Sequence, residues 1–537
     1  MKSKIFVLLA GILIFSACKE SILDIKNPAA YNEETYFKTT NELNKGIMAT
    51  YAVLLQRGMN ARDWYYAFDL MASDAMKNTF LPGDEAAMYG MTFDNTGVYP
   101  GWLWSSNFRM RTRACIMVEK SMAFTPANQT ESDNKNWVIG EGYFLKSLAY
   151  YNLVRIFGSV PYADTWSQIK DPANLKLPRS PEDTIYNHIE KDLTKAIALL
   201  PESWSSEWLG RATKYAAMGL LGKVLVTEGK YEEALVQLKA VETSGKYKLW
   251  QQTGGNKNTG YFQNFTQPDN SNSPESLFDV HHKFYGWGEG NAYFMFGGAE
   301  TWGGKATNSG RAMEYGFNDW WNTFVSTGAA QSFSYSINGN ANYIDPRGAL
   351  TFYGDPNQGG DGDWFMGAYD FHKNKTSWKK YNHYEFREKE GQPDSEIATQ
   401  LMRYSDILLL IAECNIFKAT PDFAMATQYI NQVRSRVGAT SYAAAPADLA
   451  SAFNILKLER RLELCGEQQR WFDLKRWQLL GKVPGFKMID EINKDRALDA
   501  FNLPSPMPEK YIWLPIPKQE LDNNPQMKND LHFPDWN

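Results

Sequence analysis

Cys18 is the residue whose position most clearly predicts a chemical modification. Two lysines precede the apolar run Ile5–Phe15, and Ser16-Ala17 comes directly before Cys18. This order is typical of a cleaved secretory signal. The eleven-residue run would form a helix of about 16 Å, too short for a hydrocarbon core of roughly 30 Å. Cys18, directly after the small residues Ser16-Ala17, resembles the cysteine of a bacterial lipobox, although Phe15 stands where Leu is usual. The resemblance implies cleavage after residue 17 and acylation of the Cys18 thiol. The alternative is an ordinary signal peptide followed by an incidental cysteine.

Aromatic side chains beside polar ones could bind a sugar. A sugar ring has an apolar face that stacks on an aromatic plane and a rim of hydroxyls that form hydrogen bonds. In the middle of the chain the candidates are Trp287, Glu289, Trp302, Trp320, Asp363 and Trp364. A similar set precedes them, with Tyr89, Asn95 and Tyr99 as candidates beside Asp84 and Asp94. For any single aromatic ring, core packing is the alternative, and we expect Trp102 and Trp104 to lie in the core.

Catalytic motifs do not stand out. The six histidines form no HExxH pattern, and the chain contains no G-x-S-x-G, Walker or dinucleotide-binding motif. A pair of glycosidase carboxylates has no sequence signature, because it is defined by a separation in space. We therefore expect a protein that is not an enzyme, with a glycoside hydrolase as a less favoured alternative.

No cofactor is expected, and one weak metal pattern is present. The oxygen-bearing residues Asp355, Asn357, Asp361 and Asp363 alternate in a glycine-rich stretch and could hold a structural Ca²⁺. Their spacing is not that of an EF-hand, so a solvated acidic turn is the favoured interpretation.

Composition excludes other classes of protein. The chain has 537 residues, 43% of them hydrophobic, which excludes a disordered chain. Its 56 basic and 61 acidic residues contain no long basic block, so a nucleic-acid partner is not expected. Cys115, Cys414 and Cys465 remain after processing, and three scattered cysteines do not describe a disulfide framework.

Helices must hold these candidate residues in place. Thr39 and Glu42 predict a capping box before a helix over residues 43–54. Apolar residues at helical spacing predict a second helix that ends near Gly158. Ser180 as N-cap and Pro181 as the first helical residue predict a third helix, which runs to Pro201.

Residues 221–235 have the pattern of a tetratricopeptide repeat, with a glycine turn between two helices. A looser copy extends from Ile407 to Val433. Single repeats cannot bury their apolar faces, so we expect the flanking helices to complete an all-α, tetratricopeptide-like scaffold.

Residues 251–400 differ from the rest of the chain. They contain 21 of the 40 glycines and 29 of the 77 aromatic residues, and no long helical period. We expect loops with short strands on the helical scaffold. The predicted organisation is a signal peptide at 1–17, an anchor and lead segment at 18–39, a helical region at 40–250, a loop-rich ligand-binding region at 251–400, and a C-terminal helical region at 401–537.

The C-terminal region contains a charged motif and an extended motif. Glu459, Glu463 and Glu467 lie at four-residue spacing among Arg460, Arg470, Asp473 and Arg476, which favours structural ion pairs over a catalytic pair. Leu514-Pro515-Ile516-Pro517 predicts an extended segment packed on the scaffold, because alternate prolines prevent a helix.

Together these motifs resemble the SusD/RagB family of outer-membrane nutrient-binding lipoproteins. The motifs are the lipobox, the helix and turn from Tyr143 to Tyr162, Gly210-Arg211-Ala212, residues 403–415, the charged motif and the extended motif. The resemblance covers nearly the whole mature chain in the right order.

The resemblance implies a lipid-anchored protein on the outer membrane, facing the cell exterior. It further implies a SusC-like TonB-dependent transporter as partner and an oligosaccharide or other glycan as ligand. A peptide, as in RagB-type members, is the alternative ligand. A scaffold that binds only proteins is the alternative function.

Overall fold

The computed structural model describes residues 36–60, 62–77, 83–172, 175–251, 260–266, 273–281, 300–302, 305–307, 323–354, 376–380, 398–499 and 508–528. For residues 300–302 and 305–307 the description covers the backbone alone. The predicted signal peptide, Cys18 and the first part of the lead segment lie outside the described residues.

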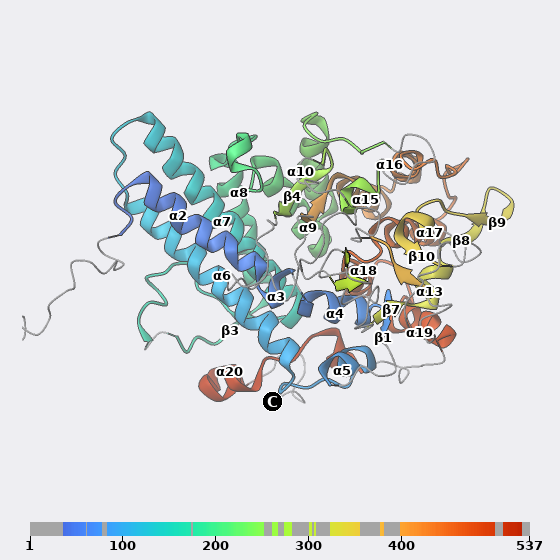
Figure 1. Cartoon of the computed structure of the whole chain (residues 1–537), viewed down its shortest axis with the longest axis horizontal. Helices are drawn as coiled ribbons and strands as arrows, with labels where there is room; N and C mark the ends of the chain where they lie inside the picture. The colour runs from blue at the N-terminus through green and yellow to red at the C-terminus, as the bar shows by residue number, and fades with distance from the viewer. Residues whose placement is uncertain are drawn as a thin grey trace, which may run out of the picture.

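Helices form the first half of the scaffold, and from α6 to α10 each packs against the next (Figure 1). The bounds are α2 Thr40–Tyr51, η2 Ala52–Leu55, α3 Arg57–Asn60, α4 Arg62–Met71, α5 Asp84–Gly90, α6 Val98–Ala123, α7 Gln129–Phe157, α8 Glu182–Leu199, η4 Ser206–Trp208, α9 Lys214–Glu228 and α10 Tyr231–Thr243.

The predicted ends of these helices are largely confirmed. The Thr39 hydroxyl accepts a hydrogen bond from the Glu42 amide at 3.3 Å, and the Glu42 carboxylate accepts one from the Thr39 amide at 2.9 Å. Helix α7 ends before Gly158, which has a φ of +73°. Helix α8 begins one residue later than predicted, because the extended backbone of Pro181 makes it the N-cap.

The two predicted helix pairs are both present. In the first pair, a Cβ at Gly222 of α9 would overlap the Leu238 side chain of α10, so only glycine allows this close approach. Gly229, with a φ of +77°, ends α9. In the second pair, α15 (Tyr404–Phe417) packs against α16 (Phe423–Ser435). Helix α10 contacts α15 and so joins the two halves. A continuous hydrophobic core includes residues from both halves.

The C-terminal part completes the scaffold. It comprises α17 Leu449–Leu464, α18 Arg470–Leu480, α19 Met488–Leu498, η10 Glu509–Ile512, α20 Lys518–Asn523 and η11 Pro525–Met527. The extended segment between η10 and α20 is buried, and the Leu514 amide donates a hydrogen bond to the Ile156 carbonyl of α7 at 2.9 Å. The predicted extended segment is therefore confirmed.

The loop-rich region leaves the scaffold and returns to it at a single point. Strand β4 (Ser276–Val280) pairs antiparallel with β12 (Thr399–Arg403), and Thr399 lies opposite Val280. The 118 residues from 281 to 398 therefore start and finish on neighbouring strands, and we call this segment the insertion.

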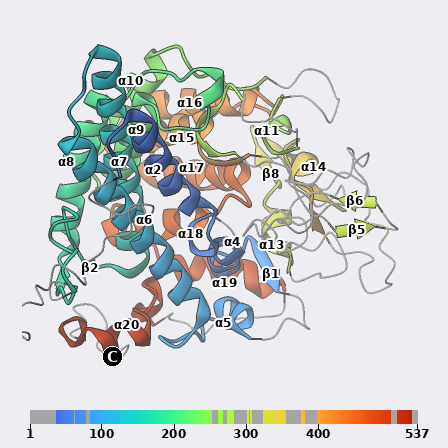
Figure 2. The same cartoon turned by 60° about the vertical axis from the view of Figure 1, so that its left-hand side comes forward.

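Short elements make up the described part of the insertion, on one side of the helices (Figure 2). These are β5 Glu300–Trp302, β6 Lys305–Thr307, β7 Thr323–Val325, α13 Thr327–Gln331, β8 Ser334–Ile337, β9 Asn340–Ile344, α14 Gly348–Thr351, β10 Phe352–Tyr353 and β11 Ser377–Trp378. Elsewhere, α11 is Gln263–Thr266, β1 is Ala75–Lys77, and β2 (Val160–Pro161) pairs with β3 (Arg179–Ser180). The mostly helical scaffold with short strands agrees with the predicted fold class.

Candidate ligand-binding site

The two regions predicted to bind ligand are joined by a pair of strands. Strand β1, which precedes the first candidate set, pairs antiparallel with β7 of the insertion, and Ala75 lies opposite Val325. The Ser326 hydroxyl also donates to the Ser73 carbonyl at 2.6 Å, and the Ser326 amide donates to the Asp74 carbonyl at 3.1 Å. Segments about 250 residues apart in the chain thus form one ledge, defined as β1, β7 and α13.

Tyr89 belongs to the core beneath this ledge. Its side chain is 3% exposed, and the guanidinium of Arg496 lies over its ring at 4.1 Å. Arg496, on α19, also donates to the carbonyls of Tyr89 and Leu70 and to the Ser73 hydroxyl. Burial lowers the pKa of Arg496 to about 10. Tyr89 therefore holds α5 on the scaffold, and its covered ring presents no stacking face to a ligand.

Tyr99 has a similar structural role. It is 1% exposed, and its hydroxyl donates to the Glu85 carboxylate at 2.8 Å, which fixes α5 to the start of α6. Of the three candidates in this segment, only Asn95 is partly exposed, and its carbonyl accepts a hydrogen bond from the Lys518 amide at 2.7 Å. The surrounding turn is held by Asp94, whose carboxylate accepts from the Thr96 amide and hydroxyl at 2.8 and 2.6 Å.

The insertion is held by buried ion pairs. Arg347, which is fully buried, donates to Asp345 at 2.8 Å and to Glu459 of α17 at 2.6 Å. Lys380 donates to Glu467 at 2.7 Å and to the Cys465 carbonyl at 2.9 Å. Since Arg347 and Lys380 belong to the insertion, these bonds fix it to the helices at two points beyond the β4–β12 pair.

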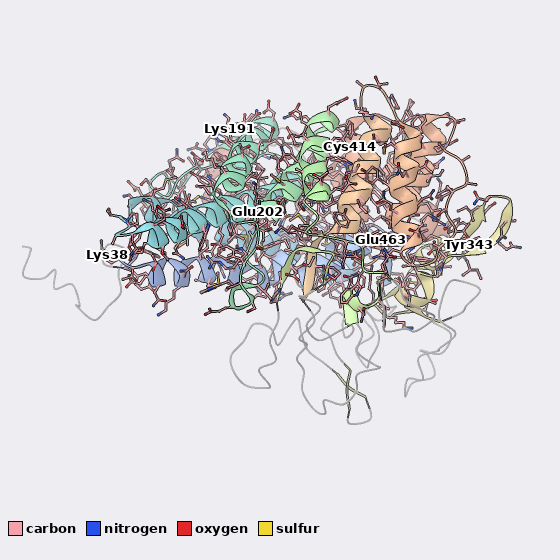
Figure 3. The ribbon with its side chains drawn as sticks, turned by 90° about the horizontal axis from the view of Figure 1, so that it is seen from above. Lys38, Lys191, Glu202, Tyr343, Cys414 and Glu463 are labelled. Carbon is pink, nitrogen blue, oxygen red and sulfur yellow. The ribbon has the colours of Figure 1, made fainter. Side chains whose placement is uncertain are left out.

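Glu463 lies at the centre of this buried ionic cluster, within the second half of the scaffold (Figure 3). Its carboxylate accepts from Arg436 at 2.5 Å and from Arg403 at 3.0 Å, and Arg347 is 3.4 Å away. Arg403 and Arg436 also both pair with Glu275. Burial raises the pKa of Glu463, but the three guanidinium groups outweigh burial and hold the pKa below its usual range.

The charged motif is therefore structural, as predicted, but its partners differ from those that helical spacing suggests. Glu459, Glu463 and Glu467 pair mainly with arginines and a lysine from other elements. Arg460 pairs with Asp473 at 2.7 Å and with Asp406 at 3.0 Å. A catalytic carboxylate would need access to a substrate, and Glu459 and Glu463 are both fully buried.

Trp102 is a surface aromatic, and the prediction that it lies in the core is wrong. Trp104 lies in the core, 4% exposed, as expected, whereas Trp102 is 37% exposed. The Arg57 guanidinium lies 5.3 Å from the centre of its ring. Residues two apart on a helix point to different faces, so the spacing of the two tryptophans already contained this signal.

The remaining candidates belong to the insertion. Trp287, Glu289, Trp320, Asp363 and Trp364 lie outside the described residues, as do the four residues of the possible Ca²⁺ pattern. Trp302 belongs to β5, where it lies opposite Lys305 of β6.

Other features of the described residues bear on chemistry. Cys115, Cys414 and Cys465 are buried and unpaired, and burial raises the pKa of the Cys115 thiol to about 11, which makes it unreactive. No three His, Cys, Asp or Glu side chains among the described residues gather in a group able to hold a metal ion. Over the same residues, the helices include none with the length and apolar character of a membrane span.

Sequence comparison matches two family descriptions to the chain. The SusD family matches residues 247–536, and a family described as starch-binding, associating with the outer membrane, matches residues 22–226. A relative named SusD-like protein P2, from Formosa agariphila, is 25% identical over 531 residues, which span 95% of this chain and 96% of the relative.

Solved structures support the same assignment of the fold. A SusD superfamily protein from Bacteroides vulgatus superposes with a TM-score of 0.73 at 22% identity, covering 93% of this chain and all of that one. A laminarin-binding SusD-like protein superposes with a TM-score of 0.68 at 23% identity, covering 92% of this chain and all of that one. The buried ionic cluster lies within residues 247–536, which the SusD family matches. Since this match covers more than half of the chain, the chain belongs to the SusD family of non-catalytic binding proteins.

Proposed function

We propose that this protein is a lipoprotein of the outer-membrane surface that captures a nutrient glycan and passes it to a SusC-like TonB-dependent transporter. Cys18 carries the lipid anchor, and the insertion together with the ledge provides the ligand-binding face. The protein binds its ligand without cleaving it.

The attachment of the insertion is the observation that carries this proposal. A binding face needs side chains held in a fixed geometry by a rigid support. The β4–β12 pair, the β1–β7 pair and the buried ionic cluster all fasten the described parts of the insertion to the helices. This supports a role for the insertion in recognition, since loops on rigid scaffolds commonly carry binding residues.

The comparisons favour a glycan. One similar structure is named as a laminarin-binding SusD-like protein, and another is described as a complex with a xylogluco-oligosaccharide. The family description that matches residues 22–226 refers to starch binding at the outer membrane. These names support a carbohydrate ligand for this chain.

Calorimetry with the purified chain, lacking residues 1–18, tests the ligand class. We would titrate it with oligosaccharides of laminarin, xyloglucan and starch and with a panel of peptides. Trp287→Ala, Trp302→Ala and Trp364→Ala should each weaken glycan binding, by a factor of about 5 to 100 for a lost stacking plane. Val236→Ala, at a 66% exposed position on α10, is the matched control and should bind like the wild type.

The outcome also distinguishes the alternatives. Binding of peptides and not of glycans would replace the glycan with a peptide cargo. Unchanged affinity in all three tryptophan variants would move the site away from the insertion. Shortening of the oligosaccharide during incubation would contradict a binding protein without catalytic activity.

The anchor and the transporter require experiments in cells. Labelled palmitate should enter the full-length protein and should be absent from Cys18→Ser. With the lipid in place, protease added to whole cells should cleave the protein, as expected for a chain facing the exterior. Affinity purification from membranes should recover a TonB-dependent barrel protein, and its absence would contradict the proposed partner.

A further inference from the structure

A large cleft lies apart from the ledge, between α6, residues from 161–172 and 175–177, and the C-terminal elements α20 and η11. Its volume is about 870 Å³, and its lining includes Trp104, Arg109, Arg111, Arg113, Lys176 and Glu520. Figures 1 and 2 place α20 on the other side of the molecule from β8 and β9 of the insertion. The proposed glycan-binding function does not use this cleft.

Arg111 is a buried cation without a hydrogen-bond acceptor among the described residues. It is 9% exposed, and its Nε and Nη1 atoms have no hydrogen-bond partner there. Its guanidinium lies against two aromatic rings, 5.0 Å from that of Phe108 and 6.0 Å from that of Tyr150. A buried guanidinium whose N–H groups lack acceptors is costly. Nε and Nη1 are covered by neighbouring atoms, and the third nitrogen, Nη2, is not among these covered atoms. An acceptor in the cleft would therefore bind Arg111 at Nη2.

The charge of the cleft favours an anionic group. Within the described part of the chain, Arg109, Arg111, Arg113 and Lys176 form no ion pair, although the chain as a whole has a net charge of −5. The Arg113 guanidinium donates to the Ala49 carbonyl at 2.5 Å, and burial, with the neighbouring charge of Arg109, lowers its pKa. An anion entering the cleft would relieve this repulsion between like charges.

The walls of the cleft are also fixed. The Asn524 side-chain amide donates to the Leu177 carbonyl at 2.7 Å, which joins the C-terminal elements to residues 175–177. The rings of Trp104 and Phe108 pack at 4.5 Å. Asn523 is exposed at the rim, and Ser105 and Thr112 of α6 add hydroxyls to the lining.

Glu520 is the one carboxylate among the described residues that line the cleft. It is half-buried in the cleft, and burial raises its pKa, while a hydrogen bond with Trp104 lowers it. A second carboxylate on an acidic peptide would be repelled by Glu520. A sugar hydroxyl would instead form a hydrogen bond with it. The lining therefore matches a ligand with one carboxylate, several hydroxyls and an apolar face.

We propose that this cleft binds an acidic sugar, whose carboxylate pairs with Arg111 and whose hydroxyls are bound by Glu520 and the neighbouring polar side chains. The ligand class is a uronic acid or a short oligosaccharide that contains one. This site is independent of the insertion, so its failure and the failure of the proposed function can be told apart.

Calorimetry tests the proposal with a trimer of galacturonic acid and, as the neutral counterpart, a trimer of galactose. The acidic trimer should bind the wild type, and the neutral one should bind at least about ten-fold more weakly. Arg111→Gln should weaken acidic-trimer binding about ten-fold or more, and Arg111→Lys should weaken it less. The surface variant Val236→Ala should bind the acidic trimer like the wild type.

Additional titrations distinguish the sources of the anion. Acetate and sulfate should bind much more weakly than the acidic trimer, and equal affinity would reduce the site to a simple ion site and overturn the proposal. Tighter binding of hexaglutamate would replace the sugar with an acidic peptide. Equal affinity of wild type and Arg111→Gln would remove the cleft as the site.

Arg111 is buried, so its variants could lose their fold. The partly exposed Glu520→Gln provides a second test, because it removes the repelling charge and keeps a hydrogen-bonding group. Glu520→Gln should bind hexaglutamate more tightly than the wild type does. Its affinity for the acidic trimer should stay within about three-fold of the wild-type affinity. No gain for hexaglutamate would overturn the discriminating role of Glu520. Circular dichroism confirms the fold of every variant.

Discussion

At the scale of single residues, the buried ionic cluster shows what the spacing of charged residues in the sequence can predict and what it cannot. The positions of Glu459, Glu463 and Glu467 correctly predicted ion pairs. Their partners Arg347, Arg403 and Arg436 could not be predicted, because they come from the insertion, β12 and the end of α16. Helical spacing reports neighbours on one helix, whereas these bonds depend on contacts between elements.

Removing a charge from the cluster should be strongly destabilising. Glu463→Gln leaves Arg403 and Arg436 with one fewer compensating carboxylate, and we expect a loss of about 3–5 kcal/mol in the free energy of unfolding. Urea unfolding followed by circular dichroism measures this loss. The exposed Glu233→Gln is the control and should change stability by less than about 0.5 kcal/mol. Equal effects of the two substitutions would contradict a structural role for the cluster.

Glu228 at the end of α9 should make stability depend on pH near neutrality. Burial raises its pKa to about 7, a hydrogen bond from Lys230 lowers it, and the nearby Glu190 raises it. The pKa of Glu228 in the folded state exceeds the ordinary value of 4.5, so protonation of this carboxyl favours the folded state. Its contribution to stability is fully present below pH 4.5 and is lost as the pH rises through about 7. Thermal melts at pH 5 and pH 8 should therefore differ less for Glu228→Gln than for the wild type. A similar pH dependence in both proteins would assign it to another group.

At the scale of elements, the repeat helices follow from local patterns. Capping residues, glycine turns and apolar spacing correctly predicted α2, the end of α7 and the pairs α9–α10 and α15–α16. Helix α8 began at Glu182 and not at Pro181, since the proline backbone is extended. The strands of the insertion were predicted only as a class, because pairs such as β1–β7 join residues about 250 positions apart.

The close approach of α9 and α10 should be sensitive to side-chain volume. Gly222→Val forces methyl groups against Leu238, so we expect destabilisation of about 1–3 kcal/mol in urea unfolding. Gly101→Ala in α6 is the matched control, because nothing lies within 4 Å of an added Cβ there. Since alanine is a better helix former, this control should be stabilised by about 0.5–1 kcal/mol. A tolerated Gly222→Val would show that the helices are not packed this closely.

At the scale of the whole molecule, the helical scaffold and the insertion are joined by strand pairing and by buried charges. The β4–β12 pair brings the two ends of the insertion together, and Arg347 and Lys380 bind it to α17 and to the residues that follow α17. The same ion pairs therefore stabilise the C-terminal helices and hold the candidate binding face in place.

Acid should weaken this attachment. Burial raises the pKa values of Asp345 and Glu467, but their basic neighbours outweigh burial and hold both values below the ordinary range. Their stabilising contribution is complete above the unfolded pKa of about 4 and is lost as pH falls through the lower folded values. Urea unfolding between pH 7 and pH 3 should show stability falling below about pH 4.5. Glu467→Gln should start from a lower stability at pH 7 and show a smaller fall, and an equal fall would contradict this assignment.

The sequence by itself determined the helical repeats, the resemblance to the SusD family and the structural nature of the charged motif, and the lipid anchor at Cys18 stays a prediction. These features depend on neighbours within a few positions or on motifs that lie in order along the chain. Only the tertiary structure decided that Tyr89 and Tyr99 are buried, that Trp102 is exposed, and that Arg111, which forms no ion pair within the described part of the chain, lines a cleft. The exposure of a side chain depends on which distant segments of the chain pack against it. An aromatic residue beside a polar residue in the sequence does not show whether such a segment covers it.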